Sequence, residues 1–186
     1  CASGMGAVAS AARSIIAGDF QLAIAGCVES MSRAPFVMSK TETAFARSNQ
    51  IFDTTIGWRF VNSAMQAMYG VDSMPQTAEN VAVDYAISRQ DQDAFAIRSQ
   101  QRWAMADQAG VFADEIAPVA VPKRRGEPVI FDTDEHPRPE TTIEQLKNLD
   151  GMNGPDSMVT AGNASGVNDG AAVLLLASEE GMKTTD

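Results

Sequence analysis

The first eighteen residues carry the clearest helical pattern of apolar positions in the chain. One face collects residues spaced three or four apart, namely Met5, Val8, Ala9, Ala12, Ile15 and Ile16. This spacing is typical of an amphipathic helix, and Gly18 stands where a glycine often ends one. We therefore predict a helix from Ala2 up to Gly18, with Cys1 at its N-terminus.

Two short apolar runs, Asp19–Gly26 and Ala171–Ala177, predict buried strands. A helix followed by a buried strand is half of a parallel α/β unit. We therefore expect an α/β fold in which the first helix and both strands belong to one layer. Residues 29–158 separate the strands and are too long and too structured to form a loop.

Capping signals divide this intervening segment into helices. Three starts are marked by Asp53, by the Ser-x-x-Gln box Ser73–Gln76 and by Ser88–Asp91. The helices they open are expected to reach Tyr69, Ala86 and Ala109 respectively, the last ending at Gly110.

The rest of the segment predicts a hairpin and one more helix. Ile116–Pro122 and Pro128–Phe131 are the expected strands of the hairpin. Thr142–Gln145 is a second capping box, opening a short helix that ends near Leu149. We therefore divide the chain into 1–28 and 159–186, two parts of one domain, and 29–158, a mainly helical inserted domain.

Composition narrows the function classes. The 186 residues are 45% hydrophobic and 20% charged, with a net charge of −10. An acidic chain lacks the basic footprint of nucleic-acid binding, and its apolar runs are too short to cross a bilayer. Two cysteines and one histidine argue against a disulfide framework and against structural zinc. This cysteine usage is typical of a reducing, cytoplasmic setting. Taken together, charge, run length and residue counts lead us to expect no metal, no nucleic acid and no membrane partner.

Cys1 is the candidate nucleophile. Unpaired N–H groups and the dipole at a helix N-terminus stabilise a thiolate, which lowers the pKa of a cysteine placed there. Ser3 and Gly4 are expected to form a tight entry turn and to let a ligand approach the backbone. The alternative is a structural cysteine that only packs.

Two further segments have functional potential. Val159–Ala172 is rich in Gly, Asn, Ser and Asp, which predicts an irregular turn with exposed backbone donors. Lys123–Arg125 is a compact basic cluster in an acidic chain. It is either a solvated turn or a site that attracts phosphates.

Three motifs resemble those of thiolases, the enzymes of coenzyme A-dependent Claisen chemistry. They are Cys1-Ala-Ser-Gly-Met5, Met74-Pro-Gln-Thr-Ala-Glu79 and Val159–Gly170. The sequence departs from the thiolase pattern at Pro75 and at Cys27, where the family usually has glycine. We expect Cys27 to be a small buried residue and not a second catalytic thiol. The resemblance implies that 29–158 is the loop domain that covers a thiolase active site.

The resemblance also implies a mechanism and a ligand. Cys1 would attack the 3-keto carbon of a 3-oxoacyl-CoA, release acetyl-CoA and pass its acyl group to free coenzyme A. Coenzyme A would be a co-substrate contacted by Met74, Arg138, Ala161 and Ser165, with no tightly bound cofactor. The family's histidine base and second cysteine lie in a C-terminal domain, so neither His136 nor Cys27 is assigned these roles. The chain would be a fragment of a homo-oligomeric enzyme, a dimer or tetramer, and inactive alone.

Two segments of the insertion, Ala34–Lys40 and His136–Thr142, look most like the branch of the family that acts on 3-oxoadipyl-CoA. Two other function classes stay open. In an N-terminal-nucleophile amidohydrolase the free amine of Cys1 would be the base, although such nucleophiles usually open a strand. A coenzyme A-binding module would use the same ligand without catalysis.

Overall fold

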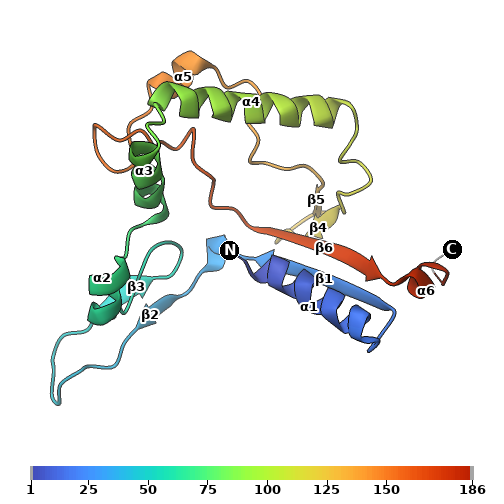
Figure 1. Cartoon of the computed structure of the whole chain (residues 1–186), viewed down its shortest axis with the longest axis horizontal. Coiled ribbons are helices and arrows are strands. Elements are labelled where there is room, and N and C mark those ends of the chain that lie inside the picture. Colours follow the sequence, from blue (N-terminus) through green and yellow to red (C-terminus); the bar gives the residue numbers. More distant parts are fainter. Residues whose placement is uncertain (1, 185–186) are drawn as a thin grey trace. The chain divides into compact units, whose positions relative to one another are not determined.

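Helix α1 (Ser3–Ala17) opens the first of two units into which the chain divides. The structure, a computed structural model, describes residues 2–184 (Figure 1). The first unit comprises the chain up to Ile56 together with the part from Val167 onward, and the second comprises Gly57–Gly166. The predicted boundaries at 28/29 and 158/159 remain predictions.

Both ends of α1 show how local sequence sets its length. Gly18 has a φ of 86°, the left-handed conformation that glycine adopts without strain, and its N–H donates to the Ile15 carbonyl. Ala2 is the N-cap and supplies no side-chain cap. Ser3 and Gly4 lie inside the first turn, so the predicted entry turn at these residues is wrong. A Cβ on Gly4 would lie 3.2 Å from the Cβ of Cys27, so Gly4 allows α1 to approach the neighbouring strand.

That strand, β1 (Leu22–Glu29), pairs with β6 (Gly170–Ala177) along its whole length. The pairing is antiparallel, from Leu22↔Ala177 to Glu29↔Gly170. The parallel unit expected for α1 and β1 stays a prediction, because among the described residues β1 pairs only with β6. Apolar periodicity reports how a strand is covered and not its direction, and the long segment between the strands allows either direction.

The prediction that these strands are buried is also wrong for the described chain. Ala25 is 6% exposed, whereas Ile24 and Val173 are 76% and 70% exposed. Side chains of a strand alternate between faces. Within this unit α1 packs on the face that carries Ala25 (Figure 1). On the opposite face, among the described elements of the unit, the short helix α6 (Glu179–Met182) lies near Leu22 and leaves Ile24 and Val173 exposed.

The rest of the first unit contains a small hairpin and two short helices. The hairpin pairs β2 (Phe36–Met38) with β3 (Ile51–Asp53), while η1 (Met31–Arg33) and α6 (Glu179–Met182) are helical turns. Asp53 ends β3, and its carboxylate accepts hydrogen bonds from the N–H and hydroxyl of Thr55. It therefore does not cap a helix, contrary to the prediction.

In the second unit, α2 (Ser63–Tyr69) begins after Asn62, whose Oδ1 accepts from the N–H groups of Ala64 and Met65. The predicted helix start was thus nine residues too early, because both Asp and Asn suit an N-cap and Asp53 is occupied in the β3 turn.

The three other helix starts in this unit are confirmed. α3 (Met74–Asp84), α4 (Arg89–Gln108) and α5 (Ile143–Lys147) follow N-cap residues Ser73, Ser88 and Thr142. The box at Thr142 is complete, whereas at Ser73 the Gln76 amide donates to Asn80 and does not return to the cap. The predicted hairpin is also present as β4 (Val119–Val121) and β5 (Val129–Phe131).

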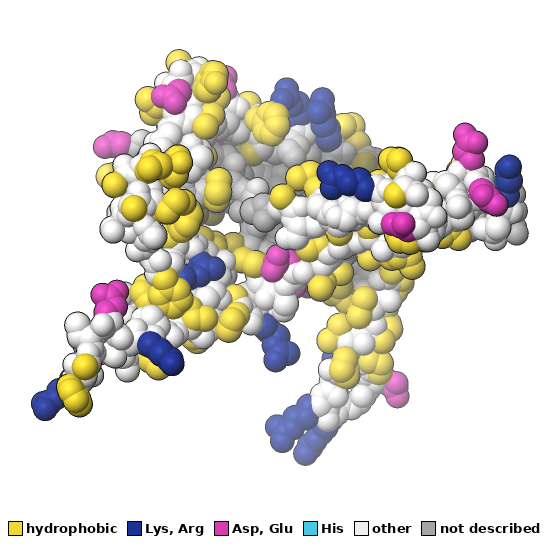
Figure 2. All heavy atoms as spheres, turned by 60° about the horizontal axis from the view of Figure 1, so that its bottom comes forward, with side chains coloured by type: hydrophobic (Ala, Val, Ile, Leu, Met, Phe, Trp, Pro, Cys, Tyr) yellow, Lys and Arg dark blue, Asp and Glu magenta, His cyan; other side chains and the backbone are white. Residues whose placement is uncertain are grey.

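Few apolar side chains are covered in this chain. The buried ones among the described residues are Ala25, Ala82, Leu146 and Val159, and hydrophobic side chains occupy much of the visible surface in Figure 2. The last three belong to the second unit, so its core forms where α3, α5 and the segment at Val159 contribute side chains. Among the described residues, none of the helices has the length and apolar character needed to span a membrane.

Candidate functional site

The two cysteines of the chain, Cys1 and Cys27, are the possible nucleophiles. Cys1 lies outside the described residues, so its role as nucleophile remains a prediction. Cys27 is exposed, contrary to the expected burial, and its Sγ donates to the carbonyl of Val28 over 3.7 Å. The neighbouring Gly4 approaches its Cβ and leaves the sulfur uncovered within the described chain.

The segment that begins at Val159 is more ordered than its composition predicts. Thr160 is fully buried and Val159 is 4% exposed. The Thr160 carbonyl accepts hydrogen bonds from the N–H groups of Asn163 and Ala164, and the Thr160 hydroxyl accepts one from Gly162. The expectation of exposed backbone donors is therefore wrong for the first half of the motif, because short-range acceptors satisfy them.

Glu79 on α3 holds the start of this segment. Its Oε1 accepts from the N–H of Val159 at 2.8 Å and from the hydroxyl of Ser157. Burial alone would raise the pKa of the Glu79 carboxyl, but hydrogen bonds from Ser157, Val159, Met158 and Asn153 outweigh it and lower the pKa below 4.5. Two motifs distant in sequence thus meet through one carboxylate.

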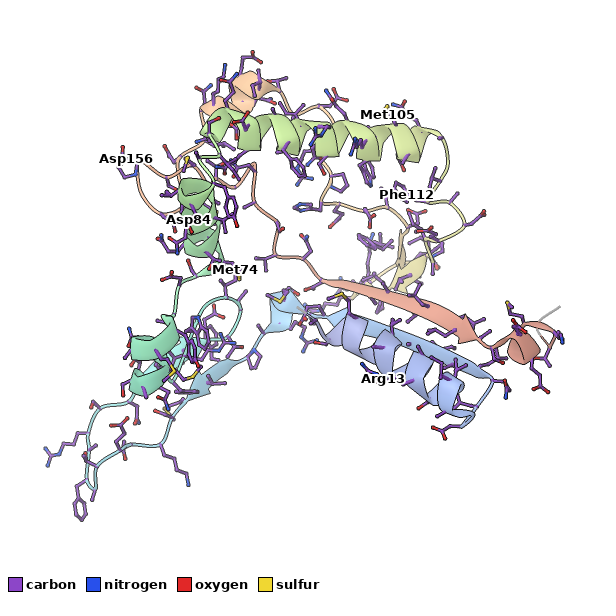
Figure 3. The ribbon with its side chains drawn as sticks, in the orientation of Figure 1. Arg13, Met74, Asp84, Met105, Phe112 and Asp156 are labelled. Carbon is purple, nitrogen blue, oxygen red and sulfur yellow. The ribbon has the colours of Figure 1, made fainter. Side chains whose placement is uncertain are left out.

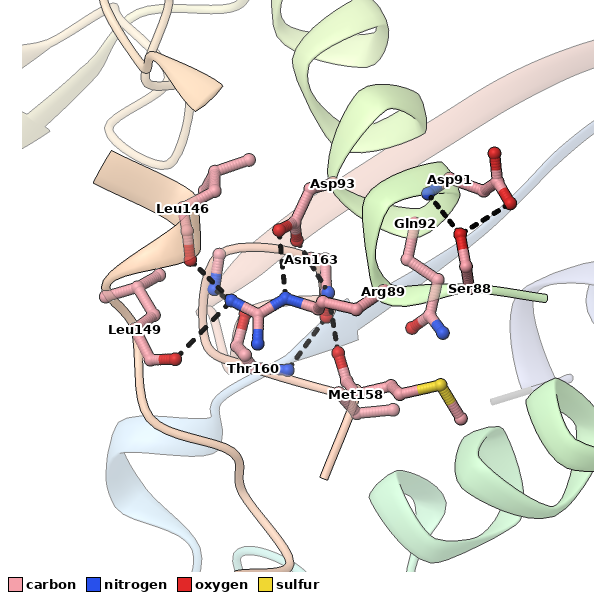
Figure 4. A network of polar contacts seen from close by, with 12 residues as sticks. Ser88, Arg89, Asp91, Gln92, Asp93, Leu146, Leu149, Met158, Thr160 and Asn163 are labelled. Carbon is pink, nitrogen blue, oxygen red and sulfur yellow. Dashed lines mark hydrogen bonds and ion pairs between the residues drawn. The ribbon is translucent and has the colours of Figure 1, made fainter. Parts of the chain in front are cut away.

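Asp93 on α4 holds the same segment from a second direction (Figure 4). It is 1% exposed, and its two oxygens accept from Arg89 Nε at 2.9 Å and from Asn163 Nδ2 at 3.0 Å. Arg89 in turn donates through Nη2 to the carbonyls of Leu146 and Leu149. Helix α4, the end of α5 and the loop around Asn163 are therefore joined by one polar network.

The other end of the motif is fixed in the first unit. Asp169 accepts from the backbone N–H of Ser32 at 2.8 Å and from its hydroxyl. These hydrogen bonds, first from the hydroxyl and then from the N–H groups of Ser32 and Met31, lower the pKa of Asp169 below 3.8 although burial opposes them. Residues 165–168, between the two fixed ends of the motif, are all exposed.

Arg138 is exposed, and part of its guanidinium is already engaged. Nη1 donates to the carbonyls of Glu135, His136 and Pro137 in its own loop. The backbone N–H of Arg138 donates to Gln100 Oε1 on α4 at 2.7 Å. The loop conformation therefore determines where the guanidinium lies.

Met74 is the first residue of α3 and is 68% exposed (Figure 3). It lines an open, mainly apolar groove of about 310 Å³ along α3. The other lining residues are Thr77, Ala78, Val81, Ala82, Ile87 and Gln92. A groove of this kind suits an apolar portion of a ligand.

The four predicted coenzyme A contacts, Met74, Arg138, Ala161 and Ser165, all belong to the second unit. Glu79 links the helix of Met74 to the segment that leads to Ala161 and Ser165, and Gln100 links Arg138 to α4. Sequence analysis missed the acceptors Glu79 and Asp93, although Arg89 four residues before Asp93 is a spacing that favours a helical ion pair.

The basic cluster Lys123–Arg125 lies in the turn between β4 and β5, where all three side chains are exposed. Both readings of the cluster, solvated turn and phosphate attraction, fit this position. Within residues 2–184 no three His, Cys, Asp or Glu side chains form a group that could hold a metal ion.

Comparison with known proteins identifies the family. The family described as "Thiolase, N-terminal domain" matches residues 1–180. A beta-ketoadipyl-CoA thiolase from Pseudomonas putida is 61% identical over 183 residues, which are 98% of this chain and 46% of that protein. A 3-oxoadipyl-CoA/3-oxo-5,6-dehydrosuberyl-CoA thiolase from Escherichia coli is 58% identical over 97% of this chain and 45% of its own length.

The fold comparison agrees. The crystal structure of human mitochondrial 3-ketoacyl-CoA thiolase in complex with CoA matches with a TM-score of 0.82 and 36% identity, over the whole chain and 45% of that structure. The predicted α/β fold class is confirmed, and the chain spans about 45% of the length of the relatives it matches. The amidohydrolase alternative is not favoured by these matches. The chain thus belongs to the thiolase family, and its residues form part of the N-terminal domain of the thiolase fold.

Proposed function

We propose that the protein is an acyl-CoA C-acetyltransferase that cleaves 3-oxoadipyl-CoA with coenzyme A. The observation that carries this proposal is the 58–61% identity, over nearly the whole chain, to thiolases named for this substrate. The products would be acetyl-CoA and succinyl-CoA, because removing a two-carbon unit from a six-carbon 3-oxo diacid leaves a four-carbon diacid.

In the proposed mechanism the thiolate of Cys1 adds to the C3 carbonyl of the substrate. The C2–C3 bond breaks, its electron pair goes to the acetyl-CoA carbanion, and a proton donor converts this carbanion to acetyl-CoA. The succinyl group stays on Cys1 as a thioester. Coenzyme A then loses its thiol proton to a base, attacks the thioester carbonyl and releases the Cys1 thiolate. We place the base and the proton donor in a C-terminal domain of the whole protein.

We assign Met74, Arg138, Ala161 and Ser165 to coenzyme A. All four side chains are exposed in the second unit, and two of them follow Thr160 in a loop held by Glu79 and Asp93. Met74 offers apolar surface beside a groove, and Arg138 offers a cation for a phosphate. The three-segment division, a cytoplasmic location and a homo-oligomeric state belong to the same proposal.

The test is to trap the acyl-enzyme in the full-length protein. After brief exposure to 3-oxoadipyl-CoA without coenzyme A, peptide mass spectrometry should find a succinyl adduct on Cys1. Cys1→Ser should abolish the adduct and lower turnover by about three orders of magnitude or more. Cys27→Ser is the matched control and should keep both. An adduct on Cys27, or turnover that survives Cys1→Ser, would overturn the mechanism, and coenzyme A binding without any turnover would favour the non-catalytic module.

A further inference from the structure

Asp93 is a buried charge with one partner more than its neutralisation requires. Arg89, four residues earlier on α4, already provides an ion pair at 2.9 Å. The second carboxylate oxygen is directed to the side chain of Asn163, seventy residues later, at 3.0 Å. A buried carboxylate can only accept hydrogen bonds, so it requires the Asn163 amide nitrogen to face it.

This requirement fixes the orientation of the Asn163 side chain. With Nδ2 facing Asp93, the same nitrogen donates to the carbonyl of Met158 at 3.0 Å and Oδ1 accepts from the N–H of Thr160 at 2.8 Å (Figure 4). A rotated amide would place a donor against the Thr160 N–H and an acceptor against the Met158 carbonyl. Asp93 therefore selects the one amide orientation that closes the loop between Met158 and Asn163.

Close packing around Gly162 also restricts the conformation of that loop. A Cβ on Gly162 would lie 2.6 Å from Cδ1 of Leu149 and would also clash with Cδ2 of Leu146. The Arg89 guanidinium binds the carbonyls of these same two leucines. Ala161 thus lies between residues held on both sides, since Thr160 is fully buried and Gly162 packs on the end of α5.

We propose that Asp93, acting through Asn163, is a positioning residue that presents Ala161 and Ser165 to coenzyme A. This inference rests on the proposed function, because it assumes that these two residues contact the ligand. Asp93 itself is 1% exposed and does not touch the ligand. Losing its charge should leave the helix in place and free the Asn163 amide to rotate, so the loss should fall on coenzyme A affinity.

The experiment compares Asp93→Asn with Asp107→Asn in the full-length protein. Asp107 is on the same helix and exposed, and its side chain makes no hydrogen bond within the described part of the chain. Asp93→Asn should raise the coenzyme A Kd and KM by about tenfold or more, the factor expected when a contact is mispositioned, with a smaller change in kcat. Asp107→Asn should leave all three unchanged.

Asp93→Asn/Asn163→Asp restores a donor–acceptor contact between the two positions, but it places a carboxylate oxygen against the Met158 carbonyl. It should therefore not recover the coenzyme A affinity, and recovery would show that the contact at position 93, and not the orientation of the Asn163 amide, sets the affinity. If Asp93→Asn does not fold, Asn163→Ser is measured in its place, because it removes the side-chain contacts of Asn163 to the loop and keeps the Arg89–Asp93 pair. It should raise the coenzyme A Kd in the same way.

A lower Tm with unchanged coenzyme A Kd in the variants would overturn the positioning role. Failure of the proposed function is distinguishable, because the wild-type protein would then lack thiolytic turnover. Calorimetry measures the coenzyme A Kd without turnover, so it tests the role of Asp93 even in that case. Wild-type protein that does not bind coenzyme A would overturn both proposals.

Discussion

The carboxylate of Glu79 accepts a 2.8 Å hydrogen bond from the backbone N–H of Val159, eighty residues further along the chain. The same oxygen accepts from the Ser157 hydroxyl. Glu79 is the last residue of the Met74–Glu79 motif and Val159 is the first residue of the Val159–Gly170 motif. Two segments that each resemble a thiolase motif are therefore in direct contact with one another.

This contact predicts a pH-dependent contribution to stability. The pKa of Glu79 is lower in the folded state than its ordinary value of 4.5. The contribution of Glu79 to the free energy of unfolding is therefore fully present above pH 4.5 and is lost as the pH falls through the folded-state pKa. Glu79→Gln should lower the free energy of unfolding by about 1 kcal/mol at pH 7, after allowing for solvent screening. The difference from wild type should shrink below pH 4.5, measured by urea unfolding across a pH series.

Asp84→Asn is the matched control, because Asp84 ends the same helix and its side chain makes no hydrogen bond within residues 2–184. A difference between Glu79→Gln and wild type that stays constant from pH 7 down to acid unfolding would show that the carboxylate charge is not the stabilising feature.

Close packing of β1 on β6 gives a second prediction. A Cβ on Gly26 would lie 2.6 Å from Cγ1 of Val173 and would clash with the carbonyl oxygen of Ala172. Backbone cannot yield as a flexible side chain does, so Gly26→Ala should cost about 2–3 kcal/mol of unfolding free energy. Gly170→Ala, in the last residue pair of the ladder, where a Cβ meets nothing within 4 Å, should change it by less than about 0.5 kcal/mol. Equal effects in chemical denaturation would contradict the close approach.

The helix starts could be predicted from sequence because their causes are local. Ser73, Ser88 and Thr142 each accept from a backbone N–H three residues ahead, which the sequence pattern encodes directly. Asp53 and Asn62 show the limit of such reasoning. Both suit an N-cap, and the choice is made by the pairing of β3 with β2, which lies elsewhere in the chain.

Strand direction and the site network depend on still longer-range relations. The run Ala171–Ala177 predicts a strand, but nothing in it indicates the antiparallel partner at Leu22–Glu29. Similarly, Asp93 and Asn163 are unremarkable separately, and only the fold brings the carboxylate to the amide. The site residues taken from the resemblance, including Cys1, remain predictions.

Arg138 gives a third prediction. Its Nη1 is held by three carbonyls of its own loop, so the guanidinium is preorganised for an anion. In the full-length enzyme Arg138→Ala should raise the coenzyme A KM by a factor equivalent to about 1–3 kcal/mol, and the loss should diminish as salt is added. Arg13→Ala, an exposed arginine on α1, is the control. An unchanged KM would remove Arg138 from the coenzyme A site.

The acyl chain of 3-oxoadipyl-CoA ends in a carboxylate, and a buried anion needs a partner. An arginine suits this role because its planar fork donates two N–H groups to two oxygens. The arginines between the turn at Ser30–Arg33 and Met74 are Arg47 and Arg59. Arg59 is the stronger candidate, since it lies between Trp58 and Phe60, which are 58% and 51% exposed and offer apolar surface for a pocket wall.

Arg59→Met tests this assignment by comparing two substrates in the full-length enzyme. The substitution should depress kcat/KM for 3-oxoadipyl-CoA at least tenfold more than for acetoacetyl-CoA, because only the dicarboxylic substrate is left with an unpaired charge. Arg59 also donates to the carbonyl of Gly57, so part of any loss will be structural and common to both substrates. Arg47→Met provides the comparison at the other arginine. Equal losses on both substrates would show that Arg59 serves the local fold and that another group recognises the carboxylate.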